Sequence, residues 1–73
     1  MKFRGFLALY REAHSELEEA ALENNMGINF IDLGNTERAA SHLNRARAIA
    51  EQHGDPQLLS EVAEAEARLA LAR

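Results

Sequence analysis

Apolar residues recur every three or four positions along most of this chain, and two glycines interrupt the pattern. Such spacing keeps one face of a helix apolar and predicts amphipathic helices whose apolar faces form the core. In residues 21–33 the recurring positions are Leu22, Met26, Phe30 and Leu33. In the second half of the chain they are Ala39, Leu43, Ala46 and Ala50, followed by Leu58, Val62, Ala65 and Leu69.

Both interruptions have the composition of a turn between two helices. Each is a glycine followed by a capping residue: Gly34 with Asn35, and Gly54 with Asp55 and Pro56. Glycine can close the preceding helix in the left-handed conformation, and an Asn or Asp side chain can cap the next one. Connectors this short place consecutive helices antiparallel. We therefore predict a helical hairpin over residues 21–53 and a C-terminal or capping helix over residues 55–73.

The N-terminal stretch, residues 1–20, keeps the same spacing but contains no clear break before the hairpin. Its apolar positions are Phe3, Phe6, Tyr10, Ala13, Leu17 and Ala20. Ser15 with Glu18 could form a capping box that starts a new helix, or Ser15 could face solvent on one helix of residues 3–33. That single helix would be about 45 Å long. Its N-terminal half would then pack on another chain.

Composition supports an all-α domain and excludes several classes of protein. The 73 residues are rich in alanine, leucine and glutamate, which favour helix, and contain no cysteine for disulfides or thiolate metal sites. The net charge of -4 argues against a nucleic-acid or anionic-membrane surface. The apolar run of residues 6–10 is too short for a signal peptide or membrane span. We expect one cytoplasmic domain over residues 1–73, with three to four helices, stabilised by self-association.

Gly27 lies inside a predicted helix, where glycine costs about 1 kcal/mol relative to alanine. This cost predicts a close approach of the helix that carries Ala39 and Ala46. The segment from residue 21 to residue 50 resembles a tetratricopeptide repeat, a helix-turn-helix unit of about 34 residues. The matching positions are Met26, Gly27, Phe30, Gly34, Ala39, Leu43 and Ala46. In its longer second helix, the segment is similar to repeats of large bacterial signalling and transcriptional regulators.

The resemblance implies an α-solenoid of about one and a half repeats that acts as a non-enzymatic protein-protein interaction module. The first helix of such a repeat lines a concave face that binds a protein or peptide segment, here through Asn24, Asn25, Ile28, Ile31 and Asp32. Asparagine can hold the backbone of an extended peptide, although Asn25 could instead pack within the helix pair. Because such arrays normally need about three repeats, we expect the open ends to meet a second copy in a homodimer.

The residue types of catalytic and metal sites form no recognisable constellation. His14, His42 and His53 lie in separate stretches and are expected to be solvated. Arg38, His42 and Arg45 form a basic line that could match an acidic helix of another chain or simply keep the helices soluble. We expect no enzymatic activity, metal or cofactor. The alternatives are a fragment of a larger regulator, a helical-bundle metal protein that uses its carboxylates, or a coiled-coil dimerisation domain.

Overall fold

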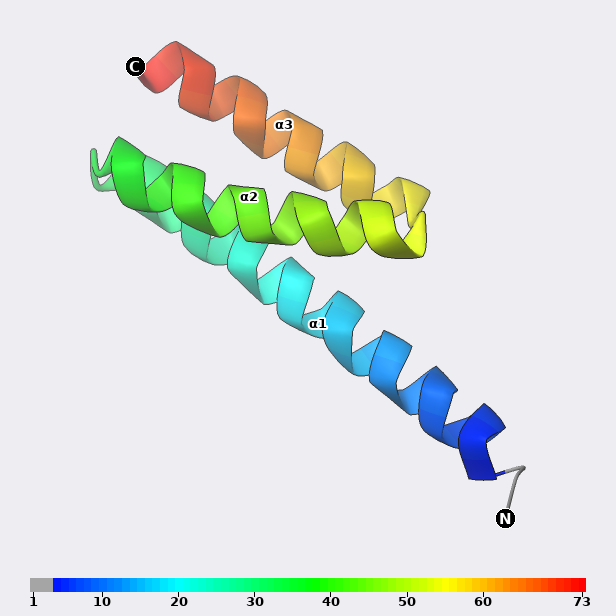
Figure 1. Ribbon diagram of the computed structural model, residues 1–73. Coiled ribbons are helices and arrows are strands. Elements are labelled where there is room, and N and C mark those ends of the chain that lie inside the picture. Colours follow the sequence, from blue (N-terminus) through cyan, green and yellow to red (C-terminus); the bar gives the residue numbers. More distant parts are fainter. Residues whose placement is uncertain (1–3) are drawn as a thin grey trace.

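The computed structural model describes residues 4–73, apart from the side chains of Arg4 and Phe6, and consists of three helices joined by short turns (Figure 1). The helices are α1 (Arg4–Asp32), α2 (Thr36–His53) and α3 (Pro56–Ala72). Consecutive helices run antiparallel, and α3 packs against both α2 and α1. No strand occurs within the described residues. The prediction of an all-α fold with antiparallel helices is therefore confirmed.

Helix α1 is one uninterrupted helix of 29 residues, so its length is about 44 Å. Ser15 lies midway along this helix, faces solvent and does not begin a new helix. Figure 1 shows that the N-terminal half of α1 extends past the ends of α2 and α3. The molecule is consequently elongated and measures 51 Å along its longest axis. Phe3, one position of the N-terminal apolar pattern, lies outside the described residues.

Both predicted turns have the expected geometry. Gly34 and Gly54 have φ values of 81° and 63°, in the left-handed region that favours glycine. The Asn35 side chain accepts a hydrogen bond from the Arg38 N–H at 3.1 Å and caps α2. Asp55 caps α3 in the same way, and Pro56 occupies the first helical position, where its missing N–H is not needed.

The core is formed largely by alanines and consists of two clusters along the three helices. The first contains Ala20, Ala46, Ala50, Leu58 and Val62, and the second Ala39, Leu43, Ala65 and Leu69. Every core position predicted for α2 and α3 is buried. The 3–4 spacing was therefore sufficient to identify the buried faces of these two helices.

The same reasoning chose the wrong face of α1 for residues 21–33, although Leu17 and Ala20 of the N-terminal pattern do pack in the first core cluster. Leu22, Met26 and Leu33 are 60%, 38% and 76% exposed, and of the positions predicted within residues 21–33 only Phe30 packs against a core cluster. The buried face instead carries smaller groups: Ala20, Asn24 and Gly27, with Ile28 and Ile31 partly buried. Long side chains on that face would hold the helices apart, so α1 turns small residues inward there and turns Leu22, Met26 and Leu33 outward.

Gly27 is the point of closest approach between α1 and α2, as its cost in a helix predicted. A methyl group added there would lie 2.5 Å from Cδ2 and 2.7 Å from Cγ of Leu43, and 3.4 Å from the carbonyl oxygen of Ala39. The two distances to Leu43 are shorter than normal van der Waals contact, and Leu43 is only 1% exposed. Any side chain at position 27 must therefore displace a packed leucine.

Candidate functional site

A groove lies between α1 and α3, along the face that the sequence predicted to be concave. It has a volume of about 380 Å³ and is lined from α1 by Ala21, Asn24, Asn25 and Ile28, and from α3 by Glu61, Glu64, Ala65 and Arg68. Helices α1 and α3 run parallel and contact each other directly, and the groove lies along their facing surfaces. We call this feature the α1–α3 groove.

The structure brings together most of the predicted concave-face residues, but not all of them. Asn24, Asn25 and Ile28 line the α1–α3 groove. Asp32 is placed near its end, where its carboxylate accepts a hydrogen bond from Arg68 at 3.2 Å. Ile31 packs against the second core cluster instead. The predicted set therefore divides into three lining residues, one ion pair beside the groove and one packing residue.

Asn24 and Asn25 have opposite environments although they are adjacent. Asn25 is exposed, so it does not pack within the helix pair. Asn24 is only 4% exposed, and its Oδ1 accepts no hydrogen bond from any described group. A buried carbonyl oxygen without a donor costs about 1 to 3 kcal/mol. Asn24 is thus the one buried polar residue of the described chain, and it lines the groove with an unused hydrogen-bonding group.

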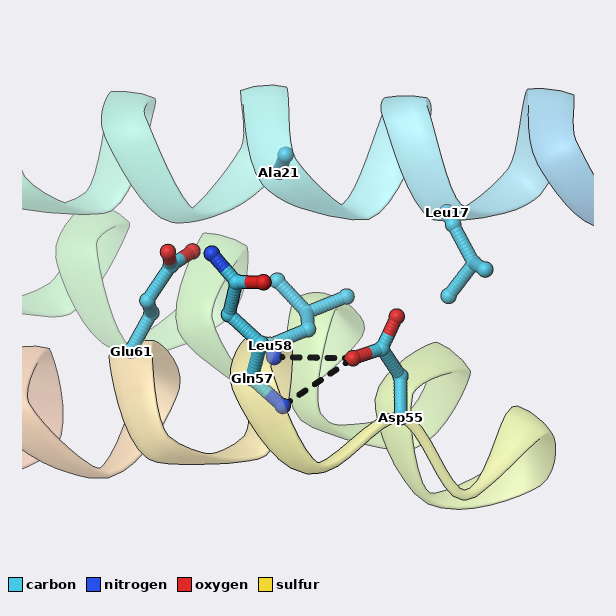
Figure 2. A pocket seen from close by; sticks show the side chains of 6 residues that line it. All are labelled: Leu17, Ala21, Asp55, Gln57, Leu58 and Glu61. Carbon is cyan, nitrogen blue, oxygen red and sulfur yellow. Dashed lines mark hydrogen bonds between the residues drawn. The ribbon is translucent and has the colours of Figure 1, made fainter.

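A second cavity continues the same furrow toward the N-terminal half of α1 (Figure 2). It has a volume of about 160 Å³ and is lined by Leu17, Ala21, Asp55, Gln57, Leu58 and Glu61. The Asp55 carboxylate accepts from the N–H groups of Gln57 and Leu58 at 3.0 and 3.1 Å, so the first N–H groups of α3 are already satisfied. Since both cavities share Ala21 and Glu61, the furrow runs from Leu17 to Arg68.

The α3 residues of the groove were not identified from the sequence. Glu61, Glu64 and Arg68 are spaced three and four residues apart and flank the apolar positions of α3. This spacing places them on one side of a predicted helix. Which side faces α1 depends on how α3 rotates to bury Val62 and Leu69, and that rotation is a property of the packed structure.

The expectation of solvated histidines is wrong for His42 and His53, whose side chains are 15% and 19% exposed. His42 Nδ1 is hydrogen-bonded to Glu23 Oε1 at 2.5 Å, and His53 Nε2 to Glu16 Oε1 at 2.7 Å. Only His14 stays on the surface, 3.2 Å from the Glu18 carboxylate one turn away. These two contacts of His42 and His53 join α1 to α2.

The basic line of α2 is matched by α1 of the same chain. Arg45 Nε lies 3.4 Å from the second carboxylate oxygen of Glu23, and the Arg38 guanidinium lies over the Phe30 ring at 5.8 Å. The His42 ring stacks on the Phe30 ring, with the two ring centroids 5.3 Å apart. All three residues of the basic line therefore contact α1 of the same chain and link the two helices of the hairpin.

Helices α2 and α3 are joined by an arginine-carboxylate pair. Arg47 Nε donates to Glu66 Oε2 at 2.8 Å, Nη2 donates to Oε1 at 2.5 Å, and Nη1 donates to Glu51 at 3.2 Å. The hydrogen bonds to Glu66, followed by those to Glu51, raise the pKa of Arg47 above its usual value. The charged guanidinium thus links α2 to α3 through paired hydrogen bonds to Glu66.

Metal-ligating groups do not converge in the part of the chain that the structure describes. No set of three or more His, Asp or Glu side chains there could hold a metal ion. Glu23 and His42 do meet, but Arg45 places a cation beside the same carboxylate. We therefore interpret the Glu23–His42 pair as a link between α1 and α2.

The search for membrane-spanning helices and the comparison with known proteins do not identify a family for this chain. None of the helices of residues 4–73 combines the length and apolarity needed to cross a bilayer. Comparison with protein families, with curated proteins and with solved structures found no match. The resemblance to a tetratricopeptide repeat therefore depends on the individual residues quoted above and remains a prediction.

Proposed function

We propose that the protein is a non-enzymatic interaction module of tetratricopeptide-like type that binds an extended peptide segment in the α1–α3 groove. The observation that carries this proposal is Asn24, a buried side chain that lines the groove and leaves its carbonyl oxygen without a donor. A peptide backbone supplies both N–H donors and C=O acceptors, and a carboxamide can pair with either after rotation of its amide group.

The other lining groups suit the same ligand. Asn25 is exposed beside Asn24 and offers a second carboxamide, while the partly exposed Ala21 and Ile28 supply an apolar surface for a side chain. Glu61 and Glu64 outnumber Arg68 among the charged groups of the groove, so it disfavours a strongly acidic ligand. A furrow from Leu17 to Arg68 also has the elongated form that an extended segment needs.

Peptide selection from a random-peptide display library tests this function. A selected peptide, titrated into isotopically labelled protein, is expected to shift the amide signals of Asn24, Asn25, Ile28 and Arg68. Shifts confined to the outer face of α1 and α2, around Glu23 and His42, would contradict the proposal. So would the failure of repeated selections to yield any binding peptide.

Two matched variants separate binding from stability. Asn25→Ala removes a lining carboxamide and is expected to weaken the selected peptide by about three- to tenfold. Asn44→Ala, an equally exposed asparagine on α2 outside the groove, is its control and should leave affinity unchanged. Asn24→Leu should abolish binding without lowering the melting temperature, because it removes an unpaired buried oxygen. Equal affinity of all variants would show that the groove is not the site.

Self-association, the other part of the function expected from the sequence, involves a different surface of α1.

A further inference from the structure

The first three turns of α1 carry large apolar side chains that the rest of the chain leaves uncovered. Leu7, Leu9 and Tyr10 are 53%, 65% and 66% exposed. Helix α2 ends at His53, which is hydrogen-bonded to Glu16, and the segment before Glu16 projects beyond both other helices (Figure 1). We call this segment, residues 4–15, the arm.

The uncovered face of the arm continues the buried face of the same helix. Positions 10, 13, 17, 20, 24 and 27 follow one another at steps of three and four, and thus lie along one side of α1. From Ala20 to Gly27 this side is covered by α2 and α3. At Tyr10 it is open to solvent. The arm therefore presents a core-type stripe that another helix could complete.

The charges of the N-terminal region specify the direction of that helix. Residues 1–11 contain the cations Lys2, Arg4 and Arg11 and no carboxylate. Residues 12–23 contain no Lys or Arg and carry the carboxylates of Glu12, Glu16, Glu18, Glu19 and Glu23. A second arm lying parallel would place like charges side by side, whereas an antiparallel arm places the basic end of each copy along the acidic segment of the other. Antiparallel helix dipoles favour the same direction.

We propose that two copies of the chain pair through their arms, antiparallel, about a two-fold axis near residues 11 and 12. The apolar pattern is symmetrical about this point, since Tyr10 of one copy then lies against Ala13 of the other, and position 6 against Leu17. At the axis, the large Tyr10 of each copy thereby meets the small Ala13 of the other. Both copies use the same surface, so the contact is closed and forms a dimer. Its short length is typical of weak, reversible association.

This pairing deepens the self-association expected from the sequence and does not depend on the α1–α3 groove. Sedimentation equilibrium of the full chain over a wide concentration range tests it. Tyr10→Lys places a charge on the open face and is expected to weaken dimerisation by at least about tenfold. Ala8→Lys, its matched control, adds the same charge two positions away on the opposite side of the exposed arm and should retain the dimer.

Three results would overturn the arm pairing. The first is a wild-type chain that stays monomeric up to high micromolar concentration. The second is a dimer that persists in Tyr10→Lys, which would place the contact on another surface such as Leu22 and Met26. The third is an equal loss in both lysine variants. The peptide affinity of Tyr10→Lys distinguishes the two proposals. A variant that no longer dimerises but still binds the peptide would show that the arm is needed for pairing and not for the groove.

Orientation has its own readout, because the chain contains no cysteine. A spin label attached to Gly5→Cys, where an added side chain meets open space, can be mixed with unlabelled, isotopically enriched protein. The antiparallel dimer predicts broadening of amide signals around Glu18 of the enriched copy. Broadening centred on position 5 instead would show parallel arms and contradict the proposal.

Discussion

The two halves of α1 share one helix and one apolar pattern, yet only one half is packed. Residues 17–32 lie against α2 and α3 and bury small groups such as Ala20 and Gly27. The arm carries larger apolar residues, among them Leu9 and Tyr10, and leaves them exposed. Since α2 and α3 have 18 and 17 residues against 29 in α1, they are too short to cover it. An apolar stripe thus predicts a contact but does not identify its partner.

The largest contrast between the halves is expected at the glycine that each of them contains, Gly27 in the packed half and Gly5 in the arm. Gly27→Leu should lower the free energy of unfolding by about 3 kcal/mol or more, because the new side chain must displace the buried Leu43. Gly5→Leu, the same substitution in the arm, meets open space and should change it by less than about 0.5 kcal/mol. Urea unfolding at a concentration where the chain is monomeric measures both. Equal effects would show that the α1–α2 contact is misplaced.

Truncation of apolar side chains gives the next largest difference. Val62 is 0% exposed, so Val62→Ala should leave a cavity and cost about 2 kcal/mol. Leu9→Ala removes more of an exposed side chain and should leave monomer stability within about 0.5 kcal/mol, while weakening self-association. Thermal unfolding at low and high concentration separates the two effects. A large loss of monomer stability in Leu9→Ala would mean that the arm is packed within its own chain.

Asp55 caps the start of α3 and lies near Leu17, where the packed half of α1 begins. Asp55→Ala removes acceptors for the N–H groups of Gln57 and Leu58 and should cost about 1 kcal/mol. Asp55→Asn, which retains a capping oxygen, should recover most of this stability. The melting temperature of the two variants is the measurement. If Asp55→Asn were as damaging as Asp55→Ala, capping would not be the reason.

The smallest effect is expected at a residue that the spacing alone placed in the core. Leu22→Glu should change the free energy of unfolding by no more than about 0.5 kcal/mol, because Leu22 is 60% exposed on the outer side of α1. Chemical denaturation compares it with wild type. A cost of several kcal/mol would restore Leu22 to the core and reverse the orientation of α1 described above.

Local chemistry made the turns and the faces of α2 and α3 predictable. Gly54, Asp55 and Pro56 each act within one turn of the chain, so their roles can be predicted without knowing the tertiary structure. On α1, two apolar stripes compete, one with Leu22 and Met26 and one with the small residues. The stripe of small residues is buried because α2 can pack closely against it. The spacing of apolar residues along the sequence does not show how closely two helices will pack.

The groove was predictable from one side only. Its α1 residues, such as Asn24 and Ile28, followed from the resemblance to a helical repeat, whereas Glu64 and Arg68 enter it through the rotation of α3. That Asn24 is buried without a donor while Asn25 is exposed also depends on this rotation. Adjacent asparagines on a helix are separated by about 100°, so which one faces inward depends on the packed helices.

Hydrogen exchange along α1, measured at two protein concentrations, tests the difference between its halves most directly. At low concentration the amides of residues 20–31 should be strongly protected, and those of residues 7–15 should exchange much faster, since an arm without tertiary contacts frays. At high concentration the arm amides should gain protection as the second copy packs against them. Uniform protection of α1 at low concentration, or an arm that stays unprotected at high concentration, would contradict this account.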